Sequence, residues 1–212
     1  MTIRLNGSVS GYTELDSPAT GGNNTLVLPT GNGSSGQYLQ TNGSGALSWA
    51  GAGKILQVVQ TVKSDTFSTA SGTGSPTTIT GFNASITPSS TTNKILVYVN
   101  IGQLSVADDS TWGIFMFRNG TKIFTGDAAG NRALGSIAGG IAGTGATWRG
   151  YPASIMYLDS PASISAVSYT FSLGNNGNVA ATIYMNRDAR NTDIANDSTR
   201  TASSIILMEV AA

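Results

Sequence analysis

Short runs of β-branched and aromatic residues, each ended by glycine, asparagine or serine, recur from Lys54 to the C-terminus. Runs with an apolar residue at every second position are typical of β-strands that bury one face. No stretch in this part of the chain has the 3.6-residue apolar period of an amphipathic helix. The sequence therefore predicts an all-β domain for residues 54–212.

About eight strands at regular spacing predict a jelly-roll-like β-sandwich, a knob of two packed sheets. The clearest local signal is Asn119-Gly120 between two β-rich runs, which predicts a tight hairpin. The expected strands are residues 55–62, 77–86, 94–101, 112–118, 121–124, 154–158, 167–173, 180–186 and 204–210.

The run at residues 94–101 is apolar on both faces. Its odd positions from 95 to 101 carry isoleucine and valine, and Leu96 and Tyr98 lie on the other face. Such a strand lies in the middle of a sandwich or against a neighbouring subunit. Together with an apolar final strand and only 10% charged residues, this pattern predicts a homotrimer.

Residues 1–53 have a different composition, with short apolar pieces among glycine, asparagine, serine and threonine. Residues 37–41 and 46–49 flank a loop of turn-forming residues and predict one hairpin. A lone hairpin is marginal in water, so we expect this extended segment to be ordered against copies of itself or a particle surface. A flexible tail is the alternative, against which Tyr12, Tyr38 and Trp49 weigh.

Charge and hydropathy exclude several partners. The 11 basic residues balance the 11 acidic ones and do not cluster, which argues against nucleic-acid binding. No apolar run approaches the ~18 residues that a membrane span requires. The first ten residues do not resemble a signal peptide, so we expect folding and assembly in a cytoplasm.

Catalysis has little support in this chain. Histidine and cysteine are absent, which excludes Ser-His-Asp and Cys-His arrangements and the usual zinc sites. The two glutamates are Glu14 and Glu209, and a glycosidase would need a carboxyl pair. Glu209 alternates with apolar residues in the last strand, where we expect a polar residue at an edge or interface. The chain is predicted not to be an enzyme.

No metal or cofactor is expected either. Asp108-Asp109 and the set Asp188, Asp193 and Asp197 lack the regular spacing of a calcium loop, so solvated turns are favoured. Residues 31–36 match G-x-G-x-x-G, but no βαβ unit surrounds them.

Two long loops, at residues 128–146 and 188–203, are expected to carry function or to cover a neighbour. After the first loop, Trp148, Arg149 and Tyr151 combine an indole, a guanidinium and a phenol that could stack on a sugar or bind a protein partner. The alternative is that Trp148 belongs to the core. Trp112 and Phe115 are predicted to be core residues.

Several segments resemble tail-fibre and other virion proteins of marine and cyanobacterial bacteriophages. They span nearly the whole chain, as residues 11–19, 24–30, 36–49, 54–60, 86–90 and 205–210. The resemblance implies a virion protein, homotrimeric, with intertwined N-terminal segments and a jelly-roll-like head. It implies no catalytic residues, and it does not separate tail from head.

The leading interpretation is a short trimeric phage fibre or appendage. Residues 1–53 would then attach it to other virion proteins, with Ile3, Arg4, Leu5 and Tyr12 as candidate contacts, and residues 54–212 would contact a glycan or protein of the host surface. A capsid decoration protein is the alternative, because fifty residues make a short shaft. A polysaccharide depolymerase is the least favoured.

Overall fold

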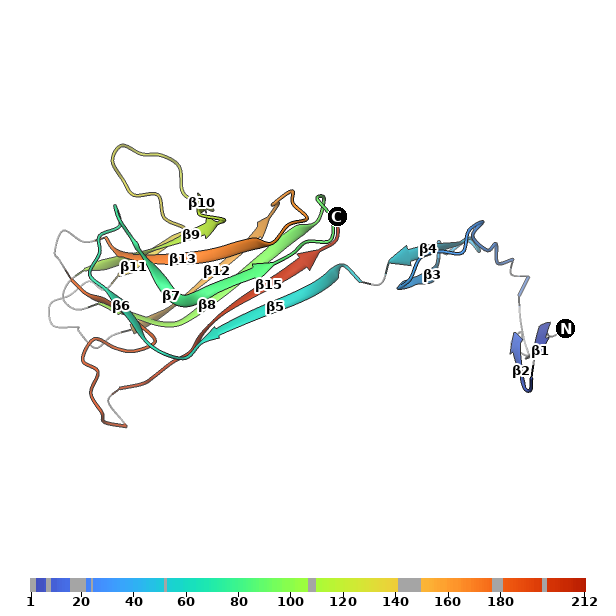
Figure 1. The fold of residues 1–212 in the computed structure, drawn as a ribbon, viewed down its shortest axis with the longest axis horizontal. Helices are drawn as coiled ribbons and strands as arrows, with labels where there is room; N and C mark the ends of the chain where they lie inside the picture. Colours follow the sequence, from blue (N-terminus) through green and yellow to red (C-terminus); the bar gives the residue numbers. More distant parts are fainter. Residues whose placement is uncertain are drawn as a thin grey trace. The chain divides into compact units, whose positions relative to one another are not determined.

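A computed structural model describes residues 3–6, 9–15, 22–23, 25–51, 53–106, 110–140, 150–176, 181–195 and 198–212 (Figure 1). It divides the chain into two compact units, Met1–Gly53 and Lys54–Ala212. The described residues form β-strands and connecting segments, which confirms the all-β prediction. They contain no helix long and apolar enough to cross a membrane.

The first unit holds two antiparallel hairpins. Strand β1 (Ile3–Asn6) pairs with β2 (Tyr12–Leu15), and β3 (Gln37–Thr41) pairs with β4 (Leu47–Gly51). The second hairpin is the one predicted. Its loop is closed by the Asn42 side chain, whose Oδ1 accepts hydrogen bonds from the backbone N–H groups of Ser44 and Ala46.

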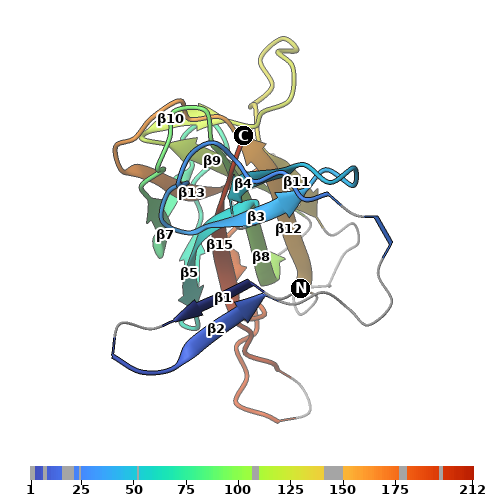
Figure 2. The same cartoon turned by 90° about the vertical axis from the view of Figure 1, so that its right-hand side faces the viewer.

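The second unit is a sandwich of two antiparallel sheets (Figure 2). The strands of the six-stranded sheet are β5 (Ile55–Lys63), β6 (Phe67–Thr69), β8 (Lys94–Val106), β12 (Gly150–Asp159), β14 (Ile183–Met185) and β15 (Ser203–Val210). Those of the five-stranded sheet are β7 (Thr77–Ile86), β9 (Thr111–Arg118), β10 (Thr121–Ile123), β11 (Ile137–Gly140) and β13 (Val167–Asn175).

The order of these strands is that of a jelly roll. Without the three-residue strands β6, β10 and β14, the described part of the unit has eight strands, which run β5-β15-β8-β12 in one sheet and β7-β13-β9-β11 in the other. In chain order these are strands 1-8-3-6 and 2-7-4-5. Successive strands therefore often alternate between sheets, which is the double Greek-key connection of the jelly roll.

Local sequence explains where the strands lie. Strand β15 alternates strictly between buried and partly exposed residues, and β8 does so from Ile95 to Ile101. Asn119 (φ 48°) and Gly120 (φ 80°) both have positive φ, as a type I′ turn requires, and they join β9 to β10 as predicted. Gly81 (φ 72°) lies within β7, where the pairing with β13 shifts register.

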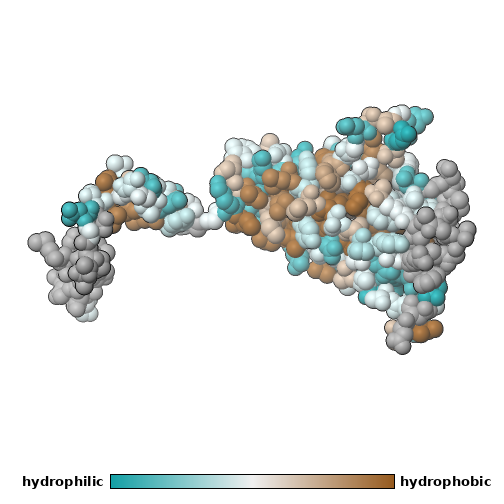
Figure 3. Space-filling model, turned by 180° about the vertical axis from the view of Figure 1, so that it is seen from behind, coloured by the Kyte–Doolittle hydropathy of each residue, from teal (hydrophilic) through white to brown (hydrophobic). Residues whose placement is uncertain are grey.

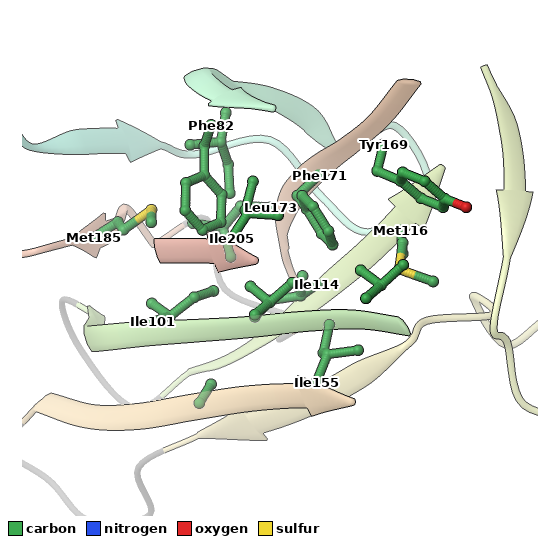
Figure 4. Close-up of a cluster of buried hydrophobic side chains, with 14 of the residues drawn as sticks. Phe82, Ile101, Ile114, Met116, Ile155, Tyr169, Phe171, Leu173, Met185 and Ile205 are labelled. Carbon is green, nitrogen blue, oxygen red and sulfur yellow. The ribbon is translucent and has the colours of Figure 1, made fainter. Parts of the chain in front are cut away.

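The core lies between the two sheets. The rings of Phe82 and Phe171 meet there with centroids 5.6 Å apart, and Ile101, Ile114 and Ile205 pack around them (Figure 4). Trp112 belongs to this core, as predicted. Phe115 is also buried, but on the other face of β9, where Lys122 lies over its ring. The central position of β8, between β15 and β12, agrees with its apolar sequence.

One expected loop is partly a strand. Residues 128–146 were expected to be irregular, but β11 lies within them and pairs with β9. Gly139 is in register with Trp112, and a Cβ added to Gly139 would lie 2.6 Å from the indole ring. The glycines therefore allow this strand to approach a large side chain, which is a reason for glycine in a strand.

Candidate functional site

Tyr151 is the described member of the predicted partner-contact set. It lies near the start of β12, in register with Leu104 of β8, and its side chain is 43% exposed. The pairing slips between Tyr151 and Ala153, and such a bulge redirects the side chains next to it. Trp148 and Arg149 lie outside the described residues.

A second aromatic side chain belongs to the same end of the six-stranded sheet. Ser105 of β8 is in register with Gly150 of β12 on one side and with Tyr184 of β14 on the other. The guanidinium of Arg187 lies 3.9 Å from the centroid of the Tyr184 ring, a cation–π contact. Sequence reasoning missed this pair, because Tyr184 alternates with Ile183 and Met185 as any strand residue would.

Asp188 organises the long polar loop that follows. It is buried, and its carboxylate accepts hydrogen bonds from the Asn191 backbone N–H (2.7 Å) and from the Ser198 hydroxyl (2.5 Å). Burial by itself raises the pKa of Asp188, but these donors lower it below its usual value. The prediction of a solvated turn is therefore wrong for Asp188. Asp193 is exposed, and Asp197 and Asp108-Asp109 lie outside the described residues.

The same loop encloses a polar hollow of about 340 Å³, lined by residues 191–195 and 198–200. Its shape is held by Arg200, whose Nη2 donates a hydrogen bond to the Asn191 Oδ1 at 2.5 Å. Hydroxyl, amide and guanidinium groups of this kind can bind sugar hydroxyls or the polar rim of a protein partner.

Glu209 is buried in the sheet and is not the edge or interface residue that we expected. Its strand β15 lies between β5 and β8, and the side chain is 1% exposed. One carboxylate oxygen accepts hydrogen bonds from the Ser89 backbone (2.6 Å), the Ser89 hydroxyl (2.7 Å) and Asn93 Nδ2 (2.7 Å). Gln57 Nε2 donates to the other oxygen at 2.9 Å.

These contacts explain the acidity of the Glu209 carboxyl. Burial raises its pKa, but the donors from Asn93, Ser89 and Gln57 outweigh burial and hold the pKa at about 2. The residue therefore fastens the connection between β7 and β8 to the last strand, which is a structural role.

A second buried carboxylate joins the two sheets. Asp159 of β12 accepts hydrogen bonds from Arg118 Nη1 of β9 and from the Tyr169 hydroxyl of β13, both at 2.7 Å. Burial, reinforced by the bond to Asp159, raises the pKa of Tyr169. Within the described residues, no group of three or more metal-binding side chains is gathered at one place.

The proposed attachment residues fall in the first hairpin of the chain. The register places Ile3 opposite Leu15, Arg4 opposite Glu14 and Asn6 opposite Tyr12. The pairing therefore brings Ile3, Arg4, Leu5 and Tyr12 into one two-stranded element.

Residues 25–51 of the first unit form no core of their own. No residue from 25 to 51 is buried, and Leu26 and Leu28 are 66% and 68% exposed. Trp49 Nε1 donates a hydrogen bond to the Gly31 carbonyl at 2.6 Å. A Cβ on Gly33 would lie 2.6 Å from the Trp49 ring. The G-x-G-x-x-G stretch therefore packs against the Trp49 indole, which leaves no room for a side chain at Gly33.

Comparison with known proteins gives no family. No family model matches the chain, and no curated protein matches it. The chain is similar to solved structures of infectious bursal disease virus. For the Gx strain the TM-score is 0.36 at 14% identity, over 99% of this chain and 46% of the other. For the VP2 subviral particle the TM-score is 0.30 at 12% identity, over 78% and 40%.

The chain thus spans about half the length of the virus proteins that it matches. With TM-scores and identities this low, the assignment of a jelly roll rests on the strand order of the chain itself. The likeness to phage virion proteins remains an expectation from the sequence.

Proposed function

We propose that this chain is a structural component of a virus particle, a short homotrimeric appendage of a bacteriophage virion. Residues 54–212 are the knob that contacts the host surface, and residues 1–53 attach the protein to the virion. The observation that carries the proposal is the contrast between the two units. A jelly-roll knob with a full core is joined to a small unit in which residues 25–51 include no buried side chain.

A unit of this kind is ordered by what it lies against. Two-stranded hairpins are marginal in water, and leucines that are two-thirds exposed gain free energy when a partner covers them. Attachment to other virion proteins and to two further copies of the segment supplies that cover. A purely enzymatic role would not account for the exposed leucines and the hairpins of residues 1–53.

We assign host contact to the end of the knob at which β12 begins, with Trp148, Arg149 and Tyr151 as the contact residues. Exchange of Tyr151 for alanine is expected to weaken adsorption of phage particles to host cells and to leave the melting temperature unchanged, because the ring is exposed. Trp148→Ala should do the same. Unfolding of the Trp148 variant, with a loss of ~3–5 kcal/mol, would instead make Trp148 a core residue. The matched control is Asn83→Ala, at an exposed position on the five-stranded sheet.

A capsid decoration protein is the second candidate, favoured by the length of the first unit, which is short for a shaft. Imaging of whole particles carrying a gold-labelled knob separates the two functions. Label at the tail supports the appendage, and label distributed over the shell supports decoration. Absence of the protein from purified particles would refute both.

A further inference from the structure

The outer face of the six-stranded sheet carries an apolar patch, bordered by polar residues such as Gln60, Asn100 and Ser154. Four neighbouring strands contribute side chains that point away from the core: Val58 and Val62 of β5, Ile206 and Met208 of β15, Leu96 and Tyr98 of β8, and Met156 and Leu158 of β12. We call these eight residues the apolar face.

The register brings seven of these eight residues into two adjacent rows. Met208 is opposite Val58 on one side and Leu96 on the other, and Leu96 is opposite Leu158. The next row runs from Gln60 through Ile206 and Tyr98 to Met156, and Val62 lies one row further, opposite Ser204. Facing side chains of neighbouring strands lie ~5 Å apart, so the rows merge into one surface. Figure 3 shows hydrophobic residues spread over the knob as seen from behind.

The other sheet shows how this chain builds a surface that faces water. Thr78, Asn83 and Ser85 of β7 and Ser168 and Thr170 of β13 point outward there. The outer residues of β7 and β13 therefore carry hydroxyl and amide groups, whereas the apolar face carries aliphatic and aromatic groups. On β9 of the same sheet, Phe115 is buried with Lys122 over its ring. A sheet with one face in water alternates apolar and polar residues, and the strands of the apolar face depart from that rule.

The exposed area is large enough for a subunit interface. Met156 is 69% exposed, Val58 and Val62 are each 58% exposed, and Leu158 is 46% exposed. The eight residues together expose on the order of several hundred Å², at the upper end of what monomers leave open and near the ~800 Å² per partner of a standard interface.

A second copy of this chain is the occupant that fits best. None of the eight side chains is charged, so copies of the face that meet around a symmetry axis bring no like charges together; Lys94 lies at the margin. Residues 25–51 of the first unit also lack a cover. If copies of the chain associate, the exposed residues of both units are covered in every copy. A partner of different sequence would need two separate surfaces, one complementary to each unit.

We infer that the apolar face is the surface through which copies of this chain associate in the knob. This inference rests on the proposed homotrimer and names the residues that form it. The five-stranded sheet, with its hydroxyl-rich outer face, is then the side that faces water.

The test uses the full chain purified after expression without other virion proteins. Met156→Glu and Val58→Glu place a carboxylate on the apolar face at exposed positions of two different strands, and Asn83→Glu places one on the polar outer face. Light scattering after size exclusion should give a multimer for the parent and Asn83→Glu. The other two variants should stay folded, and their multimer should dissociate at a protein concentration at least tenfold higher than that of the parent. A parent that is monomeric at micromolar concentration, or a multimer that survives both charges, would overturn the inference.

A second measurement exploits the absence of cysteine from the chain. Single cysteines at positions 156 and 83 can be labelled with a maleimide in the assembled protein. We expect labelling at 156 to be slower than at 83 by about tenfold or more, which corresponds to ~1.4 kcal/mol of burial or greater. Equal rates would count against the interface. Neither experiment depends on where the protein lies in a particle, so failure here is distinguishable from failure of the proposed function.

Discussion

Buried charge is used sparingly in this protein, and each buried carboxylate has specific donors. Glu209 and Asp159 accept hydrogen bonds from amide, hydroxyl or guanidinium groups of other segments, and Asp188 accepts them from its own loop. Lys63, also buried, donates to Asp65 and to the Thr80 carbonyl. Removing one partner from such a group leaves the other unsatisfied, which costs more than the hydrogen bond itself contributes.

Exchange of Glu209 for glutamine should therefore destabilise the knob by roughly 1–3 kcal/mol at neutral pH. The amide keeps the shape of the side chain but turns one acceptor into a donor, which then faces either Gln57 Nε2 or the cluster of Ser89 and Asn93. Urea denaturation measures the change. Asp193→Asn, at an exposed position, is the control and should differ little from the parent. An unchanged midpoint for Glu209→Gln would show that the carboxylate is not needed.

Glu209 should also give the knob a specific dependence on pH. Its pKa lies at about 2 in the folded protein and near 4.5 in the unfolded chain. Its stabilising contribution is thus complete above about pH 4.5 and declines as the pH falls to about 2, because the unfolded state binds the proton first. Denaturation measured across this window should show a steeper loss of stability for the parent than for Glu209→Gln. Parallel curves would contradict the assignment.

Among the elements, β11 depends on the small size of its glycines. Its glycines lie against Trp112 and Thr111, where added Cβ atoms would approach to 2.6 Å and 2.3 Å. The neighbouring Ala138 is exposed and in register with Gly113. Strand formation here depends on the absence of side chains at specific positions and owes little to β-propensity.

Gly139→Val is expected to destabilise the knob by about 1–3 kcal/mol, because overpacking against a buried indole displaces the strand or the ring. The matched control is Ala138→Val, whose side chain has open space and should change stability by less than ~0.5 kcal/mol. Thermal unfolding of both variants measures the difference. Equal melting temperatures would show that β11 pairs loosely with β9.

At the scale of the whole molecule, the hydrophobic core found among the described residues lies in the second unit. The buried apolar residues begin at Ile79 and end at Leu207, and the residues from 25 to 51 contribute none. Since packing of a core supplies most of the stability of a domain, the knob should not need the first unit to fold.

A chain reduced to residues 54–212 should thus melt within about 2 °C of the full protein, a difference that corresponds to less than ~1 kcal/mol. Circular dichroism on both proteins at equal concentration measures it. The truncated protein should also fail to incorporate into particles. A fall of more than about 5 °C would mean that the first unit stabilises the knob directly.

The sequence by itself determined the class of the fold and the positions of most strands. Alternation predicted β7 with its observed ends, and Asn119-Gly120 fixed a hairpin, because side-chain period and turn geometry are local properties. The hairpin of β3 and β4 followed from the same kind of local signal.

Only the tertiary structure decided what depends on residues far apart in the chain. Strand β11 required Trp112 beside a glycine, and Glu209 required donors from Gln57, Ser89 and Asn93. The apolar face arises where β5 and β12, nearly a hundred residues apart, lie in one sheet. Burial and strand pairing are set by groups that are distant in the chain. The residues next to a position in the sequence do not specify which distant groups will surround it.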